Sequence, residues 1–330
     1  TDFSEAGYEV GTAQLLLSDD RAAVYAPKTS PVSLADTPDA YILSVGETVY
    51  TFGRRTGLLS SLVDNGTEML LAPMVPTIWR APTDNDRNVK NKWYERGYDR
   101  AKAEFYGWGT PEVAPDRVTL RAEIALSVPG LRPHLKAAVA YTVSAEGLTV
   151  ACDAHVRAEI LAGAPLPRFG FRLTMPEGCE DVRYFGYGPV ESYADKRLAA
   201  RLGDFRTTVT ENYVPYIRPQ ENGAHDGCRF AAVSDIGGQG LYFTADDFSL
   251  TATHFSPEQL TEKAHHYELV PERETTVIID YRQAGIGSNS CGPELSPEYR
   301  LDRETIAFTF RIKPVFAGDL DPWREMRTKA

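Results

Sequence analysis

The chain has 330 residues, of which 42% are hydrophobic and 25% are charged, and these proportions are ordinary for a soluble globular protein. Its formal net charge of −11 argues against a nucleic-acid backbone or an anionic membrane as the main partner, because both carry negative charge. No apolar run approaches the ~20 residues of a transmembrane helix. The 26 glycines and 22 prolines predict frequent turns and few long helices.

The first segment of the chain has the pattern of an isolated strand followed by a linker. Residues 12–18, TAQLLLS, are strand-like in composition, whereas residues 21–40 contain three prolines and few large apolar side chains. We therefore interpret residues 1–20 as a strand of another domain, residues 21–38 as a linker and residues 39–330 as one domain. The chain opens without an initiator methionine or a secretory signal pattern, so we expect a processed or excised fragment of a longer product.

A polar stretch at residues 79–95, WRAPTDNDRNVKNKWYE, contains regularly spaced oxygen side chains. Four of them have the ligand spacing of an EF-hand calcium loop, namely Asp84, Asp86, Asn88 and Glu95. The sixth position of such a loop needs glycine for a sharp turn, whereas the β-branched Val89 stands there. Two interpretations follow, a calcium loop that lacks its glycine or a polar turn stabilised by its own side chains.

Period-two alternation of apolar and polar residues dominates the rest of the chain. It is clearest over residues 118–128, 139–143 and 148–156, which predict antiparallel strands with one face exposed to solvent. Residues 306–312 predict another such strand, and the one predicted helix lies within residues 91–105. Many short strands separated by turns predict an all-β fold in the form of a large antiparallel sandwich.

Motifs for several common chemistries are missing from the sequence. Neither a G-x-S-x-G nucleophile elbow nor an H-x-x-x-H pair occurs, so a serine triad and a zinc site are not supported. The four cysteines show no C-x-x-C spacing. Free thiols in a chain of this length favour a reducing compartment, so we expect a cytoplasmic location, with the periplasm as an alternative.

Carboxylates and aromatic side chains leave a role in carbohydrate chemistry open. Acid/base work in a retaining glycosidase requires two carboxyl groups ~5 Å apart, a separation that a sequence does not reveal. Six carboxylates are candidates, namely Asp84, Asp86, Glu191, Asp195, Glu221 and Asp280. Aromatic residues gather within residues 79–108 and 184–216, where they serve either as core or as faces for sugar rings.

Long motifs occur in a fixed order along nearly the whole chain. They are TDFSEAGYEVGTAQL at the start, VYTFGRRTGLLSSL (49–62), WRAPTDNDR (79–87), LPRFGFRLTMP (166–176), YFGYGPVESYADKR (184–197), YVPYIRPQENGAHDGCR (213–229), HHYELV (265–270) and DYRQAGIGSNSCGPELSPEYRL (280–301). In this order they resemble the carboxy-terminal, small-chain region of lacZ-type β-galactosidases of glycoside hydrolase family 2.

The resemblance implies a fold and a role in a larger enzyme. The expected fold is a large antiparallel super-sandwich of the galactose mutarotase-like type, with residues 1–20 as the last strand of a preceding immunoglobulin-like domain. The catalytic glutamates of the family lie in a TIM barrel, which no part of this chain resembles. We therefore expect a fragment or small subunit of a retaining β-galactosidase, which acts on terminal β-D-galactosides such as lactose and is inactive without the barrel portion.

The partners and cofactors implied by the resemblance also belong to the complete enzyme. The expected partners are the catalytic TIM-barrel portion, the β-galactoside bound by the complete enzyme, and further copies in a homo-oligomer. Nucleic acid and membrane are not expected as partners. Magnesium and sodium are expected only in the catalytic portion, and no cofactor or metal is expected in this chain.

Two loops are implied to approach the sugar pocket, and neither is implied to contain a catalytic residue. The first contributes Arg80, Asp84, Asn85, Asp86 and Asn88. The second is the Gly-Ile-Gly…Gly-Pro loop, which contributes Asn289, Ser290 and Cys291. The best-known members present a tryptophan at the position of Cys291, and a thiol does not stack on a sugar face, so the substrate preference stays open.

Two other functions compete with this interpretation. One is an independent carbohydrate-binding module that uses the aromatic residues on the sandwich. The other is an aldose mutarotase, which needs a histidine and a glutamate at the anomeric centre of the sugar. His225 with Glu221, or His265 with Glu191, are the candidate pairs, although neither pair lies in a mutarotase-like motif.

Overall fold

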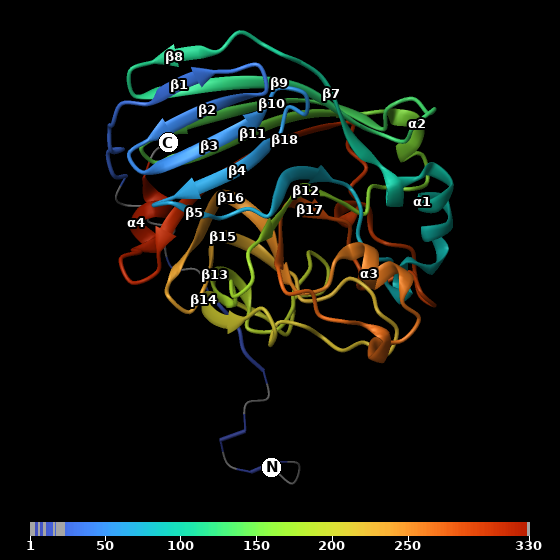
Figure 1. The fold of residues 1–330 in the computed structure, drawn as a ribbon. Helices are drawn as coiled ribbons and strands as arrows, with labels where there is room; N and C mark the ends of the chain where they lie inside the picture. Colours follow the sequence, from blue (N-terminus) through green and yellow to red (C-terminus); the bar gives the residue numbers. More distant parts are fainter. Residues whose placement is uncertain (1–3, 6, 9–10, 16, 18–23, 329–330) are drawn as a thin grey trace.

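The computed structural model describes residues 4–5, 7–8, 11–15, 17 and 24–328. Antiparallel strands form the larger part of its regular secondary structure, in a 5-stranded and a 13-stranded sheet (Figure 1). The predicted all-β class with large antiparallel sheets is thus confirmed.

The smaller sheet is a meander in which each strand pairs with the next one along the chain. Its strands are β1 (Ser33–Asp36), β2 (Ala40–Val45), β3 (Thr48–Gly53), β4 (Leu59–Asp64) and β5 (Thr67–Glu68). Alternate residues such as Leu43, Tyr50 and Phe52 are buried, as the period of a strand with one covered face requires. The sheet begins at Ser33, within the range that we predicted as a linker.

The structure describes only part of the predicted strand at residues 12–18. Residues 16 and 18 lie outside the described residues, as do residues 19–23, and residues 12–15 and 17 are not in a strand here. The assignment of residues 1–20 to a preceding immunoglobulin-like domain therefore stays a prediction, together with the division into linker and main domain.

The strands predicted from alternation form the middle of the larger sheet. They are β9 (Arg117–Ser127), β10 (Leu135–Ser144), β11 (Gly147–Val156) and β18 (Thr305–Phe316). Tyr141 of β10 stands opposite Leu120 on one side and Val150 on the other, and Val150 in turn faces Phe310. These four strand predictions are confirmed.

The remaining strands extend this sheet on both sides of the four central strands. They are β6 (Ala72–Thr77), β7 (Lys102–Trp108), β8 (Glu112–Ala114), β12 (Arg168–Met175), β13 (Asp181–Gly188), β14 (Arg201–Thr208), β15 (His225–Ser234), β16 (Gln239–Thr253) and β17 (Thr275–Gln283). The long β16 pairs with β18 over residues 239–244 and with β17 over residues 249–253. One strand therefore joins the central part of the sheet to the part that contains β12 and β17.

The two sheets pack face to face over a continuous apolar core, as in a sandwich (Figure 1). Aromatic rings span the interface. The Phe52 and Tyr141 ring centroids are 5.0 Å apart, and Tyr41 meets Trp108 edge-on at 5.4 Å.

The helix predicted within residues 91–105 is shorter than expected. The α1 helix (Lys90–Arg96) ends at Gly97, whose left-handed φ of 74° terminates it, and a single 3-10 turn at Tyr98–Arg100 follows. Phe105 already belongs to β7, so the second half of the predicted helix is wrong. The tight path at Gly97 is required by packing, because a Cβ there would lie 2.9 Å from a methyl group of Val128.

Three further short helices were not predicted. They are α2 (Ala158–Leu161), α3 (Pro257–Glu262) and α4 (Pro322–Arg327). The last two begin with proline after a Ser or Asp cap, a start signal that the sequence does contain. Among the described residues, no helix combines the length and apolar composition needed to cross a lipid bilayer.

Candidate functional site

The two loops expected at the sugar pocket leave the larger sheet at the same end. Both β6 and β17 pair antiparallel with β12, one on each side, so β6 and β17 run parallel to each other. Thr77 of β6 and Asp280 of β17 both stand opposite Gly170. The chain segments that follow β6 and β17 therefore leave the sheet near each other. We call residues 80–89 the first loop and residues 284–293 the second loop.

Arg80 joins the two loops from beneath. Its guanidinium donates to both carboxylate oxygens of Asp86, at 2.9 and 3.2 Å, and also to the carbonyl oxygen of Ala284. The Arg80 side chain has no exposed surface, and Asp86 is almost as deeply buried. A buried charge is tolerated only when it is paired, so this pair ties the first loop to the start of the second. Arg80, although predicted at the sugar pocket, does not reach the surface.

The first loop is a 3-10 turn, η1 (Asp84–Asn88), closed by its own side chains. Asp86 Oδ2 accepts from the Thr83 backbone N at 2.8 Å and from Thr83 Oγ1 at 3.0 Å. Asp84 is exposed and exchanges two hydrogen bonds with the Gln220 side chain. Asp86 is thus committed to Arg80 and Thr83. The loop has the form of the self-capping polar turn.

Metal binding has no cluster of ligands to support it in the part of the chain that the structure describes. There, no group of three or more His, Cys, Asp or Glu side chains is arranged to hold a metal ion.

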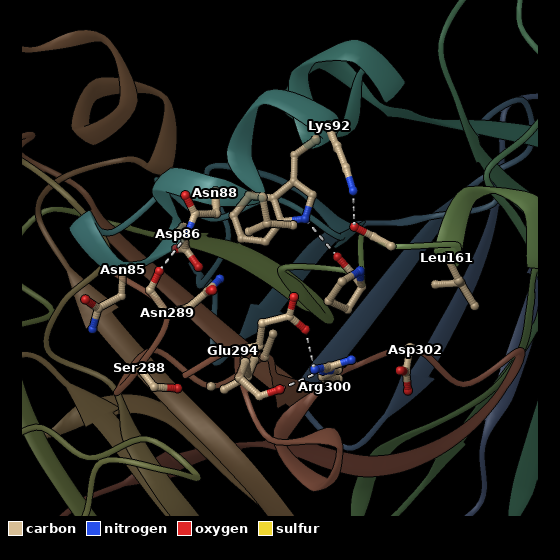
Figure 2. Close-up of a pocket in the computed structure, with 17 residues that line it drawn as sticks. Asn85, Asp86, Asn88, Lys92, Leu161, Ser288, Asn289, Glu294, Arg300 and Asp302 are labelled. Atoms are coloured by element: carbon tan, nitrogen blue, oxygen red, sulfur yellow. Dashed lines mark hydrogen bonds and ion pairs between the residues drawn. The ribbon is translucent and has the colours of Figure 1, made fainter. Parts of the chain in front are cut away.

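Two asparagines connect the loops at the surface. Asn85 Nδ2 donates to the carbonyl oxygen of Ile286 at 2.5 Å. Asn88 Nδ2 donates to the carbonyl oxygen of Asn289 at 2.9 Å (Figure 2). Asn289 itself has a left-handed φ of 88°, a conformation that asparagine tolerates better than most residues. Three of the eight predicted residues, namely Asn85, Asn88 and Asn289, therefore meet where the two loops touch at the surface.

The second loop has an anchor that was predicted only as one of several carboxylates. Asp195 accepts from the backbone N of Ile286 at 2.9 Å and from that of Gly287 at 2.8 Å. The approach is so close that a Cβ on Gly285 would collide with the Asp195 carboxylate. Asp195 lies in the motif YFGYGPVESYADKR, but nothing in that motif indicates its distant partners.

Cys291 and Ser290 form the outer end of the second loop. The Cys291 thiol is exposed, and Ser290 Oγ lies 3.7 Å from its sulfur. Neither residue lines the two hollows that border the loops. The site therefore presents a thiol toward solvent where the resemblance implies a tryptophan in other members.

A small hollow of about 230 Å³ lies between the loops and α1 (Figure 2). Four predicted residues line it, namely Asn85, Asp86, Asn88 and Asn289. Charged residues that were not predicted complete its wall, namely Lys92, Glu294, Arg300 and Asp302. Arg300 pairs with Glu294 at 3.3 Å and donates to the Leu295 carbonyl at 2.7 Å. Arg300 lies in the last quoted motif, but its contacts depend on the fold of the loop.

A larger hollow of about 730 Å³ lies on the other side of the first loop, and we call it the large hollow. Asp84 and Asn85 line it together with Ile286, and opposite them are Glu191, Lys196, Tyr216 and Leu198. Lys196 Nζ lies 2.7 Å from Glu191 and 2.9 Å from the Tyr216 hydroxyl, which also donates to Glu191. Burial and the hydrogen bond to Glu191 raise the pKa of Tyr216 above its ordinary value.

A buried ionic network supports the floor of the large hollow. Arg168 contacts Asp280 at 2.7 Å and Glu221 at 3.3 Å, and neither Arg168 nor Asp280 is exposed. Burial raises the pKa of Asp280 to about 6, against the opposing effect of Arg168. Gln283 donates to the other oxygen of Glu221 at 3.3 Å. The carboxylates of Asp280 and Glu221 are thus both bound by protein groups, and two members of the network, Asp280 and Gln283, directly precede the second loop.

The histidine pairs considered for a mutarotase are not formed. His225 is buried, stacks on Tyr184 at a ring distance of 4.0 Å and bonds to Asn212 at 2.7 Å, and burial lowers its pKa to about 4. His265 stacks on Tyr267 and lies 3.5 Å from Glu268. Neither histidine therefore has its candidate glutamate as its partner in the described contacts.

Comparisons with known proteins identify relatives of the chain. Residues 44–312 match the family described as beta galactosidase small chain. A β-galactosidase of Staphylococcus xylosus is 40% identical over 274 residues, which cover 82% of this chain and 27% of that protein. A β-galactosidase of Actinobacillus pleuropneumoniae is 34% identical over 323 residues, covering 94% of this chain and 31% of that protein. The chain thus spans less than a third of the length of either relative.

Solved structures with a similar arrangement include a galactose mutarotase-like protein of Clostridium acetobutylicum. It superposes with a TM-score of 0.47 at 10% sequence identity, over 88% of this chain and 100% of that chain.

Proposed function

Because the chain belongs to the beta-galactosidase small-chain family, we propose that it is the carboxy-terminal part or small subunit of a retaining β-galactosidase. The family resemblance drawn from the sequence motifs is confirmed by the match over residues 44–312. In this proposal the chain completes the galactoside pocket of an enzyme whose catalytic carboxylates lie on another portion.

The junction of the two loops carries the proposal. Asn85 and Asn88 of the first loop bond to the backbone of the second loop, and Arg80 and Asp86 lock the same junction from below. Three attachments described above, from Asn85 to Ile286, from Asn88 to Asn289 and from Arg80 to Ala284, hold the loops as one edge, which is how a site on loops gains the precision that substrate positioning requires. We assign Arg80 as a positioning residue of this edge rather than a substrate contact.

The state of the local carboxylates supports a positioning role. A retaining mechanism needs one carboxylate free to attack and another free to donate a proton. Here Asp86 is bound by Arg80 and Thr83, and Glu221 and Asp280 are bound by Arg168. We therefore propose that the isolated chain does not hydrolyse glycosides. The Asn88 amide, the Ser290 hydroxyl and the Cys291 thiol would border the sugar instead.

The compartment and cofactors of the proposed enzyme follow from the same assignment. We propose a cytoplasmic enzyme, with the periplasm as the alternative, whose magnesium and sodium sites belong to the catalytic portion. The described cysteines are all free thiols, which suits a reducing compartment.

The experiment combines this chain with the catalytic portion of its enzyme and measures nitrophenyl-galactoside hydrolysis. We expect activity only when both portions are present. Asn88→Ala, which removes one attachment between the loops, is expected to lower the activity without preventing assembly. No activity with both portions folded would refute the proposal, and micromolar galactose binding by the isolated chain would favour the carbohydrate-binding module instead.

A further inference from the structure

Four large apolar side chains are exposed on one side of the site. They are Val190 at 51% exposed, Ile217 at 80%, Tyr267 at 72% and Leu198, which is fully exposed. Single exposed apolar residues are normal on a protein surface, whereas a group of neighbouring ones marks a surface that binds something. We call these four residues the apolar band.

A shared hollow and a backbone hydrogen bond link the segments that contain the four residues. Val190 and Leu198 both line the large hollow, together with Tyr216. Ile217 follows Tyr216 directly, and its carbonyl oxygen accepts from the His266 backbone N at 3.2 Å. Tyr267 belongs to the 3-10 turn η3 (His266–Glu268), and its ring stacks on His265 at 5.0 Å. The band therefore runs from the rim of the large hollow to η3.

The band adjoins the proposed pocket edge. Asp84 and Asn85 of the first loop, and Ile286 and Gly287 of the second, line the same hollow as Val190 and Leu198. The Gln220 side chain, three residues after Ile217, exchanges hydrogen bonds with Asp84. A body that closes the pocket edge over this hollow therefore also meets the apolar band.

We propose that the apolar band is the docking surface for the catalytic portion of the same enzyme. This inference rests on the proposed function and adds the contact surface to it. The two relatives that the chain matches are more than three times longer than the matched segment, so most of each relative lies outside the part represented here. A second copy of this chain is a less suitable occupant, because it would cover the pocket edge that the substrate has to reach.

Site-resolved thiol labelling tests the proposal in the complete enzyme. Leu198→Cys and Ile217→Cys place thiols in the band, and Ile236→Cys is the matched control, since Ile236 is fully exposed in the turn between β15 and β16. Maleimide labelling of each thiol is followed by mass spectrometry, which separates it from the exposed Cys291. We expect labelling at 198 and 217 to slow about tenfold or more between isolated chain and complete enzyme, as burial in an interface core requires, and labelling at 236 to stay unchanged.

The outcomes separate this inference from the proposed function. Equal labelling rates at 198, 217 and 236 in an enzyme that hydrolyses nitrophenyl-galactoside would overturn the docking surface and leave the proposed function standing. Protection that appears in the isolated chain as its concentration rises would mean that a second copy covers the band, and would also overturn the inference. A complete enzyme without galactosidase activity would refute the proposed function itself.

Discussion

Replacement of Arg80 by methionine tests whether a buried ion pair holds the candidate site together. Methionine keeps most of the side-chain volume but leaves Asp86 buried without its cation, and removal of one partner of a buried pair costs about 3–5 kcal/mol. Thr83 still donates two hydrogen bonds to Asp86, which places the expected cost toward the lower end. With an unfolding entropy of about 2.1 cal/mol/K per residue, a chain of this length should lose roughly 4–7 °C in Tm.

Urea and thermal unfolding of the isolated chain measure this change. The control is Arg172→Met, which removes an arginine from a partly exposed pair with Glu258 of α3. Exposed pairs contribute about 0–1 kcal/mol, so this variant should unfold close to the wild type. Asp86→Leu combined with Arg80→Met should recover part of the stability lost in the single variant, because no buried charge is then left unpaired.

Two results would refute the reasoning about Arg80. One is a loss of less than about 1 kcal/mol in Arg80→Met, which would mean that Asp86 finds another partner or water. The other is strict additivity of the Arg80 and Asp86 substitutions, since residues in one hydrogen-bonded network should be coupled by about 0.5–3 kcal/mol.

Three further predictions concern the loops, the buried histidine and the end of α1. Asp84→Ala should lower kcat/KM of the complete enzyme toward nitrophenyl-galactoside several-fold while changing the Tm of the chain little, because Asp84 is exposed and loses only the hydrogen bond that its carboxylate accepts from Gln220; equal loss of Tm and activity would indicate a structural role. The pKa of His225 is lowered from 6.5 to about 4 in the folded state, so the unfolded state binds the extra proton and the folded state loses stability as pH falls from about 6.5 to 4. His225→Gln should lack this part of the pH dependence, measured by urea unfolding across that range, and an unchanged slope would contradict the assignment. Gly97→Ala should cost about 1–2 kcal/mol or more, because its left-handed φ is unfavourable for alanine and its Cβ would crowd a neighbouring methyl group; Gly130→Ala, at a similar φ of 83° but with open space around it, is the control and should lose less stability.

The strands of the central sheet could be predicted because their signal is local. Residues 118–156 alternate in polarity, and the strands that they form pair with their neighbours along the chain. The period of two reports one covered face directly, so both the existence and the order of these strands follow from the pattern. The helix predicted within residues 91–105 was too long because its end depends on a distant contact. Charges at helical spacing do not reveal that Gly97 must turn the chain against Val128.

The position of the site could not be obtained from periodicity. Family motifs pointed to the two loops, but the pairing of β6 and β17 on opposite sides of β12 is what brings them together. Their contacts join residues about 200 positions apart, such as Asn85 with Ile286 and Asn88 with Asn289. No local propensity encodes a contact of that separation. The burial of Arg80 was missed for the same reason, because an arginine in a polar loop has no sequence feature that distinguishes a buried anchor from a surface contact.

Two buried arginines together determine the geometry of the site. Arg168 holds Asp280 and Glu221 at the base of the second loop, and Arg80 holds Asp86 and the Ala284 carbonyl between the two loops. Apolar packing could stabilise this region equally well, but it tolerates sliding between surfaces, whereas a bidentate guanidinium fixes both the distance and the orientation of its carboxylate. Asp86 of WRAPTDND and Asp280 at the end of β17 thus act as fixed points that hold the two loops in place. That role explains why carboxylates are abundant around a site that we propose to position a substrate rather than to cleave it.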